Sequence, residues 1–174
     1  MRISFVLVGR TMPGFTQLID RVGKTFKAET GFEFMEFPQT GSFDDKRGQY
    51  DADLLISEIG RFFSPGEKTL FITREDLFSK PLNFVFGLAK GDSAIVSMAR
   101  LDPRFYGPVD DARKASALFR ERVLKESVHE IGHALGLPHC DDERCVMAFS
   151  NSIGDVDGKG ADFCQGCRKP LHLD

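Results

Sequence analysis

The eleven residues 129–139, HEIGHALGLPH, constrain this chain more than any other segment. They contain three of its four histidines, His129, His133 and His139, with Glu130 directly after the first. A helix advances about 100° per residue, so His129 and His133 lie one turn apart on the same face and can bind one metal ion. Glu130 lies one residue further round the helix and can reach a water bound to that ion.

Gly136 and Pro138 explain how a third histidine joins the first two. His139 is too far along the axis of a continuing helix, but glycine tolerates the left-handed conformation that ends helices, and proline prevents the helix from resuming. The reversed chain brings His139 back. A lone HExxH also occurs in ordinary amphipathic helices, whereas the full HExxHxxGxxH is far more specific. We expect three neutral nitrogen ligands and an open position, as hydrolytic zinc requires.

The run continues as HCDDERCVM and later CQGC, which gives HExxHxxGxxHCx4CxM followed by CxxC. The histidine signature with a following methionine turn (Met-turn) is typical of metzincin metallopeptidases. The cysteine directly after the third histidine, with three more downstream, resembles the archaemetzincin branch. The final CxxC follows Met147 after sixteen residues, against about seventeen in the branch pattern, which is a trivial loop difference. The motifs cover residues 129–167, and the resemblance upstream is one of layout.

This resemblance implies a compact metzincin-like fold, a zinc-dependent peptidase activity, and a role for Met147 as an apolar floor beneath the imidazoles. The chain departs from some metzincins two residues after that methionine, where they place a tyrosine and this sequence has Phe149. Phenylalanine has no hydroxyl, so assistance by a tyrosine at that position is excluded.

The four cysteines, Cys140, Cys145, Cys164 and Cys167, fall within 28 residues and are the only cysteines of the chain. Four thiolates satisfy tetrahedral zinc completely, and we expect a structural zinc held by all four. Two disulfides, or a redox-active CxxC at 164–167, are the alternatives. The N-terminal MRISFVLVGR reads as a first strand and not as a signal peptide, which favours the cytoplasm and zinc over disulfides. The prediction is two zinc ions per chain.

The apolar patterns predict a small set of strands and helices along the chain. Strands are expected at 3–8, about 32–37, 69–73, 83–89 and 94–101. One helix opens at Thr11 and Pro13 and carries an apolar stripe of Phe15, Leu18, Ile19, Val22 and Phe26. A second contains Leu55, Ile59, Phe62 and Phe63 and ends at 64–66. The longest ends at Gly136. Residues 40–50 and 102–111 are predicted loops.

Two βα units followed by a hairpin through residues 90–92 predict a fold of the α/β (α+β) class. The sheet should be mixed, mostly parallel and twisted, with one antiparallel strand and two or three long helices. We expect 83–89 to be an edge strand that could bind an extended peptide, although an internal strand is the alternative. Residues 1–136 would form an N-terminal subdomain, and 137–174 a small C-terminal subdomain with the Met-turn and the four cysteines, within one catalytic domain.

Composition excludes several other classes of protein. The net charge is −3, with no run of lysine or arginine, which argues against nucleic acid or a membrane surface as a partner. No apolar stretch reaches transmembrane length. We expect a peptide or protein substrate and a monomer in the cytoplasm.

The prediction for function is a zinc metallopeptidase in which Glu130 acts as general base on a zinc-bound water. Whether it would act as an aminopeptidase or an endopeptidase is open. The alternative is a catalytically weak or inactive zinc protein that binds peptides or partner proteins in the same cleft. The intact Glu130 argues against that alternative, because a binding site needs no general base. His139 disfavours a site whose third ligand is a distant glutamate, and the all-histidine set disfavours a zinc deaminase.

Overall fold

The main feature of the computed structural model, which describes residues 1–63 and 66–173, is a five-stranded sheet with the order β2-β1-β5-β8-β7. Its strands are β1 (Arg2–Val8), β2 (Glu29–Met35), β5 (Lys68–Thr73), β7 (Gly87–Lys90) and β8 (Ser93–Ser97). Neighbouring strands pair in parallel except β7, which is antiparallel to β8. The predicted α/β class with a mixed, mostly parallel sheet is therefore confirmed.

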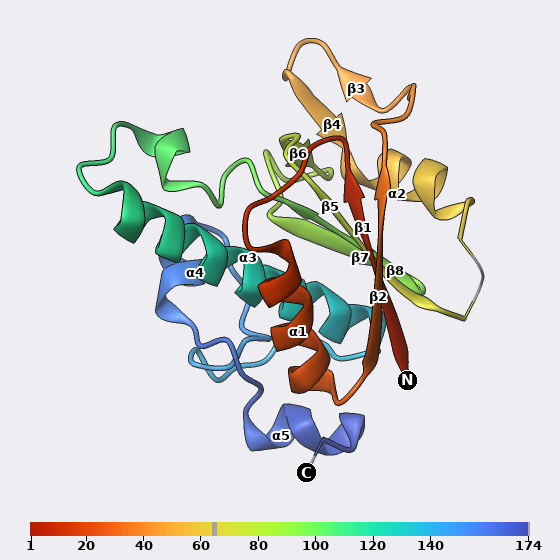
Figure 1. Cartoon of the computed structure of the whole chain (residues 1–174), viewed down its shortest axis with the longest axis vertical. Coiled ribbons are helices and arrows are strands. Elements are labelled where there is room, and N and C mark those ends of the chain that lie inside the picture. The colour runs from red at the N-terminus through yellow and green to blue at the C-terminus, as the bar shows by residue number, and fades with distance from the viewer. Residues whose placement is uncertain (64–65, 174) are drawn as a thin grey trace.

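Helices cover both faces of this sheet (Figure 1). They are α1 (Phe15–Phe26), α2 (Ala52–Gly60) and α3 (Ala112–Ala134). The alternation of apolar side chains along β1 explains the layers, because residues two apart in a strand share a face. Phe5 and its same-face neighbours pack with α1 and α3, whereas Val6 and Val8 pack with α2.

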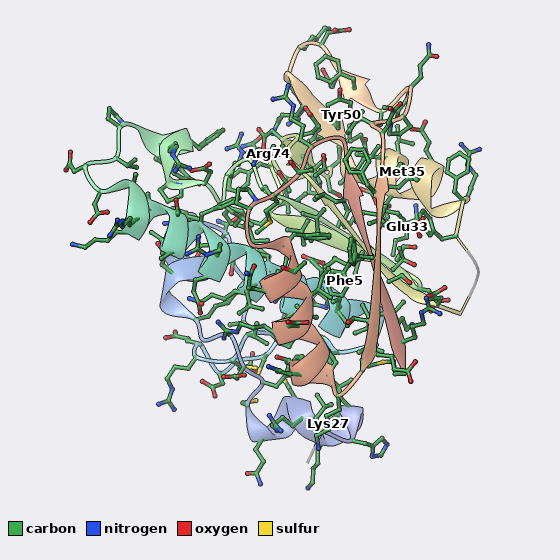
Figure 2. The ribbon with its side chains drawn as sticks, viewed as in Figure 1. Phe5, Lys27, Glu33, Met35, Tyr50 and Arg74 are labelled. Atoms are coloured by element: carbon green, nitrogen blue, oxygen red, sulfur yellow. The ribbon has the colours of Figure 1, made fainter. Side chains whose placement is uncertain are left out.

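One apolar core joins the sheet, α1, α3 and the C-terminal segment. Phe5 of β1 lies beneath α1 and meets Phe15 edge to face, with ring centroids 6.4 Å apart (Figure 2). The same cluster includes Met147, Val156 and Phe163 from the C-terminal segment. That segment contains the short helices α4 (Ile153–Gly158) and α5 (Gln165–Arg168) and a 3₁₀ turn at Lys169–Leu171. The boundary between 136 and 137 stays a prediction.

The predicted loop at 40–50 is wrong in part, because it contains two short strands. These are β3 (Phe43–Asp44) and β4 (Gln49–Asp51), which join β6 (Leu77–Phe78) in a second, three-stranded sheet. Such short strands leave no periodic signal, and tertiary pairing creates them.

The second helix is shorter than its apolar pattern predicts. It ends at Gly60, and Phe62 beyond it is 72 % exposed. The predicted stop at 64–66 falls partly on residues 64 and 65, which lie outside the described residues. The strand predicted at 32–37 runs earlier, from 29 to 35, and the loop at 102–111 contains a 3₁₀ turn at Pro103–Tyr106.

The strand predicted at 83–89 begins only at Gly87, because Val85 is drawn into an isolated bridge with Leu77. From Gly87 onward the prediction is confirmed: β7 is an edge strand, joined to β8 through a tight turn in which Gly91 has a φ of 62°. The strand predicted to run to residue 101 stops at Ser97. Among the described residues, no helix is long and apolar enough to cross a membrane.

Candidate active site

The last two turns of α3 place the first two predicted ligands. His129 is buried, and His133 follows one turn later at the half-buried end of the helix. The helix ends at Ala134, and Gly136 adopts a φ of 91°, a conformation that favours glycine. The chain then turns back, and one ligand nitrogen from each of the three histidines lies within 4.8 Å of the others.

Two backbone carbonyls orient the first two imidazoles. His129 Nδ1 lies 2.8 Å from the carbonyl oxygen of Val146, and His133 Nδ1 lies 2.8 Å from that of Leu137. A carbonyl only accepts, so each Nδ1 must carry the hydrogen, and each Nε2 presents a free lone pair. The two Nε2 atoms are 3.0 Å apart. Histidines in this tautomer, held by carbonyls, fit a zinc ion.

The electrostatics keep these imidazoles neutral, the form that binds metal. Burial lowers the pKa of His129 well below its usual value, and the charge of Lys159 lowers it further. Burial also lowers the pKa of His133 and of His139.

Glu130 lies beside the histidines with a carboxylate that is buried against the edge strand. Burial raises its pKa well above the usual value, and the nearby Glu126 raises it further, while Lys159 acts in the opposite direction. The room for this side chain comes from Gly87 of β7. A Cβ at Gly87 would stand 2.6 Å from Cγ and 2.7 Å from Oε1 of Glu130.

A cleft of about 340 Å³ opens between α3, the edge strand β7 and the Met-turn. Glu130 and the three histidines lie along it. Apolar side chains surround them, and Glu126 adds a second carboxylate. The other cleft-lining side chains that bear on its chemistry are Leu82, Phe84, Phe86, Leu88 and Phe149.

Met147 is fully buried beneath α3. Its sulfur packs where Gly132 leaves space, since a Cβ on Gly132 would stand 2.5 Å from Met147 Sδ. The imidazole of His139 meets the exposed ring of Phe149, with centroids 5.0 Å apart.

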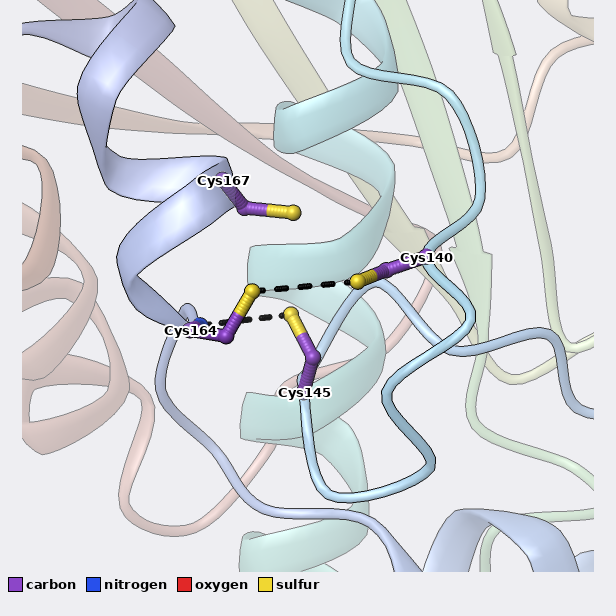
Figure 3. A group of neighbouring side chains, drawn as sticks. All are labelled: Cys140, Cys145, Cys164 and Cys167. Carbon is purple, nitrogen blue, oxygen red and sulfur yellow. Dashed lines mark hydrogen bonds between the residues drawn. The ribbon is translucent and has the colours of Figure 1, made fainter.

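Two cysteines from the loop after His139 meet two from the start of α5, so that the four side chains form one group (Figure 3). Their sulfur atoms lie within 4.8 Å of one another, and none forms a disulfide. Cys145 Sγ accepts hydrogen bonds from the backbone N–H of Met147 and of Cys164, at 3.4 and 3.3 Å. Converging sulfurs that accept N–H bonds fit a tetrahedral metal site.

The cysteine group is joined directly to the Met-turn. The N–H of Cys140 donates to the carbonyl of Met147 at 2.9 Å, and the N–H of Met147 donates to Cys145 Sγ. Both backbone polar groups of Met147 are therefore held by the cysteine loop.

The sequence did not predict four residues of the site: Leu137, Val146, Glu126 and Lys159. Leu137 and Val146 act through their backbone carbonyls, which leave no signal in a sequence. Glu126 lies one helical turn before Glu130, and that four-residue spacing was a usable signal. Lys159 lies thirty residues beyond His129, with no motif to connect them.

Comparisons with known proteins agree with this geometry. Residues 40–173 match Peptidase family M54. The archaemetzincin of Haloarcula marismortui is 41 % identical over 172 residues, covering 97 % of this chain and 98 % of its own. The crystal structure of archaemetzincin from Archaeoglobus fulgidus, complexed with malonate, superposes with a TM-score of 0.82 at 36 % identity and covers 98 % of this chain and 99 % of its own.

A zinc-dependent peptidase from Methanocorpusculum labreanum has a TM-score of 0.85 at 28 % identity, covering 97 % of this chain and 99 % of its own. The family match spans well over half of the chain, and the relatives agree with it in sequence and in fold. The chain therefore belongs to peptidase family M54, the archaemetzincins, and is a zinc metallopeptidase.

Proposed function

We propose that His129, His133 and His139 hold a catalytic zinc and that Glu130 is the general base of peptide-bond hydrolysis. The observation that carries this proposal is the convergence of three neutral imidazoles beside a buried carboxylate in an open cleft. His129 and His133 offer a free Nε2 in the way that zinc sites use, and His139 adds a third ring nitrogen.

Zinc in such a site supplies Lewis acidity that polarises a peptide carbonyl and acidifies a water. Glu130 takes the proton from the attacking water and passes it to the leaving amine. Burial raises the pKa of Glu130, which brings this carboxyl closer to the pH at which it must both accept and release a proton. Phe149 provides no hydroxyl, so no tyrosine at this position adds to the stabilisation of the oxyanion.

The edge strand β7 offers a place for the substrate. Its outer backbone groups are unpaired in the sheet, so an extended peptide can add to it as a further strand. Gly87 and Leu88 of this strand line the same cleft as Glu130. The apolar lining of the cleft favours apolar side chains near the scissile bond.

A second zinc is proposed for Cys140, Cys145, Cys164 and Cys167, which gives two zinc ions per chain. The support is the close grouping of four sulfurs in a C-terminal segment of about 38 residues, too short to be stable on its own apolar core. A monomeric state and a cytoplasmic location remain predictions, and sedimentation of the purified protein tests the first.

The test of catalysis compares zinc-loaded wild-type protein with Glu130→Gln on a broad peptide library. We expect cleavage by wild type and a loss of at least a hundredfold in Glu130→Gln, with zinc content unchanged. Glu36→Gln, an exposed change far from the cleft, is the control. Equal inactivity of wild type and Glu130→Gln would favour the non-hydrolytic alternative.

The test of the ligand set is zinc content. His139→Ala should retain the cysteine-bound zinc and lose the histidine-bound one, so that the bound zinc falls from two ions to one. Unchanged occupancy would refute the assignment of His139.

A further inference from the structure

Helix α3 carries three buried charged residues in addition to its histidines and Glu130. They are Arg122, Lys125 and Glu126, which are 6 %, 7 % and 2 % exposed. Arg122 pairs through two nitrogens with Asp157, at 2.7 Å each. Lys125 donates to the carbonyls of Val156 and Asp157, at 3.0 and 3.2 Å. Buried charges are costly unless they are paired, so these contacts tie α3 to the α4 segment.

The third of these residues, Glu126, pairs with Lys159 at the edge of the metal site. Lys159 Nζ lies 2.8 Å from Glu126 Oε1, and the two side chains are 1 % and 3 % exposed. The same ammonium lies 3.4 Å from the carbonyl oxygen of Ala148 and 3.4 Å from His129 Nδ1. Lys159 therefore stands where α3, the Met-turn and the end of α4 meet.

The carbonyls on either side of Met147 are both tied to α3. The carbonyl of Val146 accepts from His129 directly, and the carbonyl of Ala148 accepts from Lys159, which pairs with Glu126. Glu126 and His129 are three residues apart on the helix and so share a face. The Met-turn is thus held against α3 at two points, one of which is a metal-ligand candidate.

Glu126 also faces the cleft that Glu130 lines. Without Lys159 it would place an uncompensated negative charge one turn from the carboxylate of the general base. The pairing with Lys159 offsets that charge.

We propose that Lys159 and Glu126 are positioning residues of the histidine site. They fix the Met-turn behind His129, and the ammonium compensates the carboxylate that stands beside Glu130. The inference rests on the proposed function, in that it assigns these residues a part in the same site. Neither Lys159 nor Glu126 is proposed to contact the substrate.

The pair Arg122–Asp157 is a matched control. It joins α3 to α4, two residues before Lys159, through an equally short, charged contact. Arg122, however, precedes His129 by seven residues, which is about 10 Å along the helix axis. Arg122→Met therefore breaks an anchor of α4 without disturbing the contacts of His129.

The experiment uses the whole 174-residue chain loaded with zinc. The variants are Lys159→Met, Lys159→Arg, Glu126→Gln, the double change Glu126→Gln/Lys159→Met, and Arg122→Met. Three quantities are measured: the zinc affinity of the histidine site by chelator competition, the visible spectrum of Co²⁺ in that site, and kcat and KM on a cleaved peptide.

We expect Lys159→Met to weaken zinc binding at the histidine site about tenfold or more, which is the usual effect of removing a group that orients a ligand. The Co²⁺ spectrum should shift, and kcat should fall more than KM rises. Lys159→Arg keeps the positive charge, so its zinc affinity and kcat should lie between those of Lys159→Met and the wild type. The double change should cost less than the sum of the two single changes, because it leaves no unpaired charge.

Wild-type zinc affinity and Co²⁺ spectrum in Lys159→Met, with a stability loss equal to that of Arg122→Met, would overturn the proposal and leave the pair as a fold anchor. If Lys159→Met does not fold, the other two single variants decide the question. Wild-type zinc affinity and a wild-type Co²⁺ spectrum in both Lys159→Arg and Glu126→Gln would equally overturn the proposal. Absence of peptidase activity in wild type would refute the proposed function, while the metal measurements would still decide this inference.

Discussion

Gly87 of the edge strand and Glu130 of α3 approach so closely that no side chain fits between them. A Cβ at Gly87 would lie 2.6 to 2.8 Å from three atoms of the glutamate side chain. The backbone of the proposed substrate-binding strand is therefore in direct contact with the proposed general base.

Gly87→Ala should displace the Glu130 carboxylate while leaving the metal ligands in place. A misplacement of about 1 Å in a catalytic group costs roughly a hundredfold in rate, and we expect a loss of that order in kcat/KM. Zinc content should stay at the wild-type value. Gly41→Ala, where the nearest atom is 3.9 Å from the new Cβ, is the control. Full activity in Gly87→Ala would show that the glutamate does not depend on this contact.

Gly132→Ala should force the Met-turn away from α3. The new methyl group would overlap Met147 Sδ, 2.5 Å from its position. Overpacking of this kind costs about 1–3 kcal/mol, measured as the free energy of unfolding. The double variant Gly132→Ala/Met147→Ala removes the overlapping sulfur, so its loss should be smaller than the sum of the two single losses. Simple additivity would contradict the proposed packing.

Glu130→Gln should stabilise the protein at neutral and higher pH. Burial and Glu126 raise the pKa of Glu130, so the folded protein keeps a proton that the unfolded chain has already released. The contribution of the protonated Glu130 carboxyl to the free energy of unfolding is therefore present at low pH. It is lost as the pH rises through the pKa that this carboxyl has in the folded protein.

Glutamine does not ionise and escapes this loss. The thermal unfolding of both forms should be compared at about pH 5, close to the usual pKa of an unfolded glutamate, and at about pH 8, well above it. Both measurements use the His139→Ala background, which lacks a zinc ligand. The gain in Tm should be larger at the higher pH. A gain independent of pH would show that it does not come from the ionisation of Glu130, and Glu36→Gln is the exposed control.

Cys164→Ser should weaken zinc at the histidine site, although Cys164 touches no histidine. The N–H and the carbonyl of Met147 are both bound by the cysteine loop. Loosening that loop frees the residue next to Val146, whose carbonyl orients His129. Removal of such support costs roughly 10–100-fold in metal affinity. Asp141→Asn, an exposed change in the same loop, should have no effect. Wild-type affinity in Cys164→Ser would show that the two sites are independent.

The parts of the site that could be predicted are those whose geometry is local in sequence. His129 and His133 share a helical face by their spacing, and Gly136 turns the chain within three residues of His139. The four cysteines could be predicted as a metal site because thiolates bind zinc and the four lie close together in the sequence. The mixed, mostly parallel sheet with one antiparallel strand could be predicted because its apolar runs are long enough to show a period.

What escaped prediction depends on contacts between distant segments. Glu126 and Lys159 are 33 positions apart, and each alone reads as a solvated charge. Helix α3 is buried at every position from residue 122 to 132, so its apolar stripe is faint and its charged residues look exposed in sequence. The strands at 43–44 and 49–51 are only two and three residues long, and they pair with each other and, through β4, with the distant β6.

The residues that orient His129 and pair the buried charges of α3 lie after α3 in the chain, between residues 146 and 159, so the ribosome synthesises them later. His129 is oriented by Val146, and the charged residues of α3 are paired by Asp157 and Lys159. A nascent chain that has only just exposed its histidines lacks all of these partners. Because a domain generally folds as a unit, we expect the cleft to become competent only after residue 159 has left the exit tunnel.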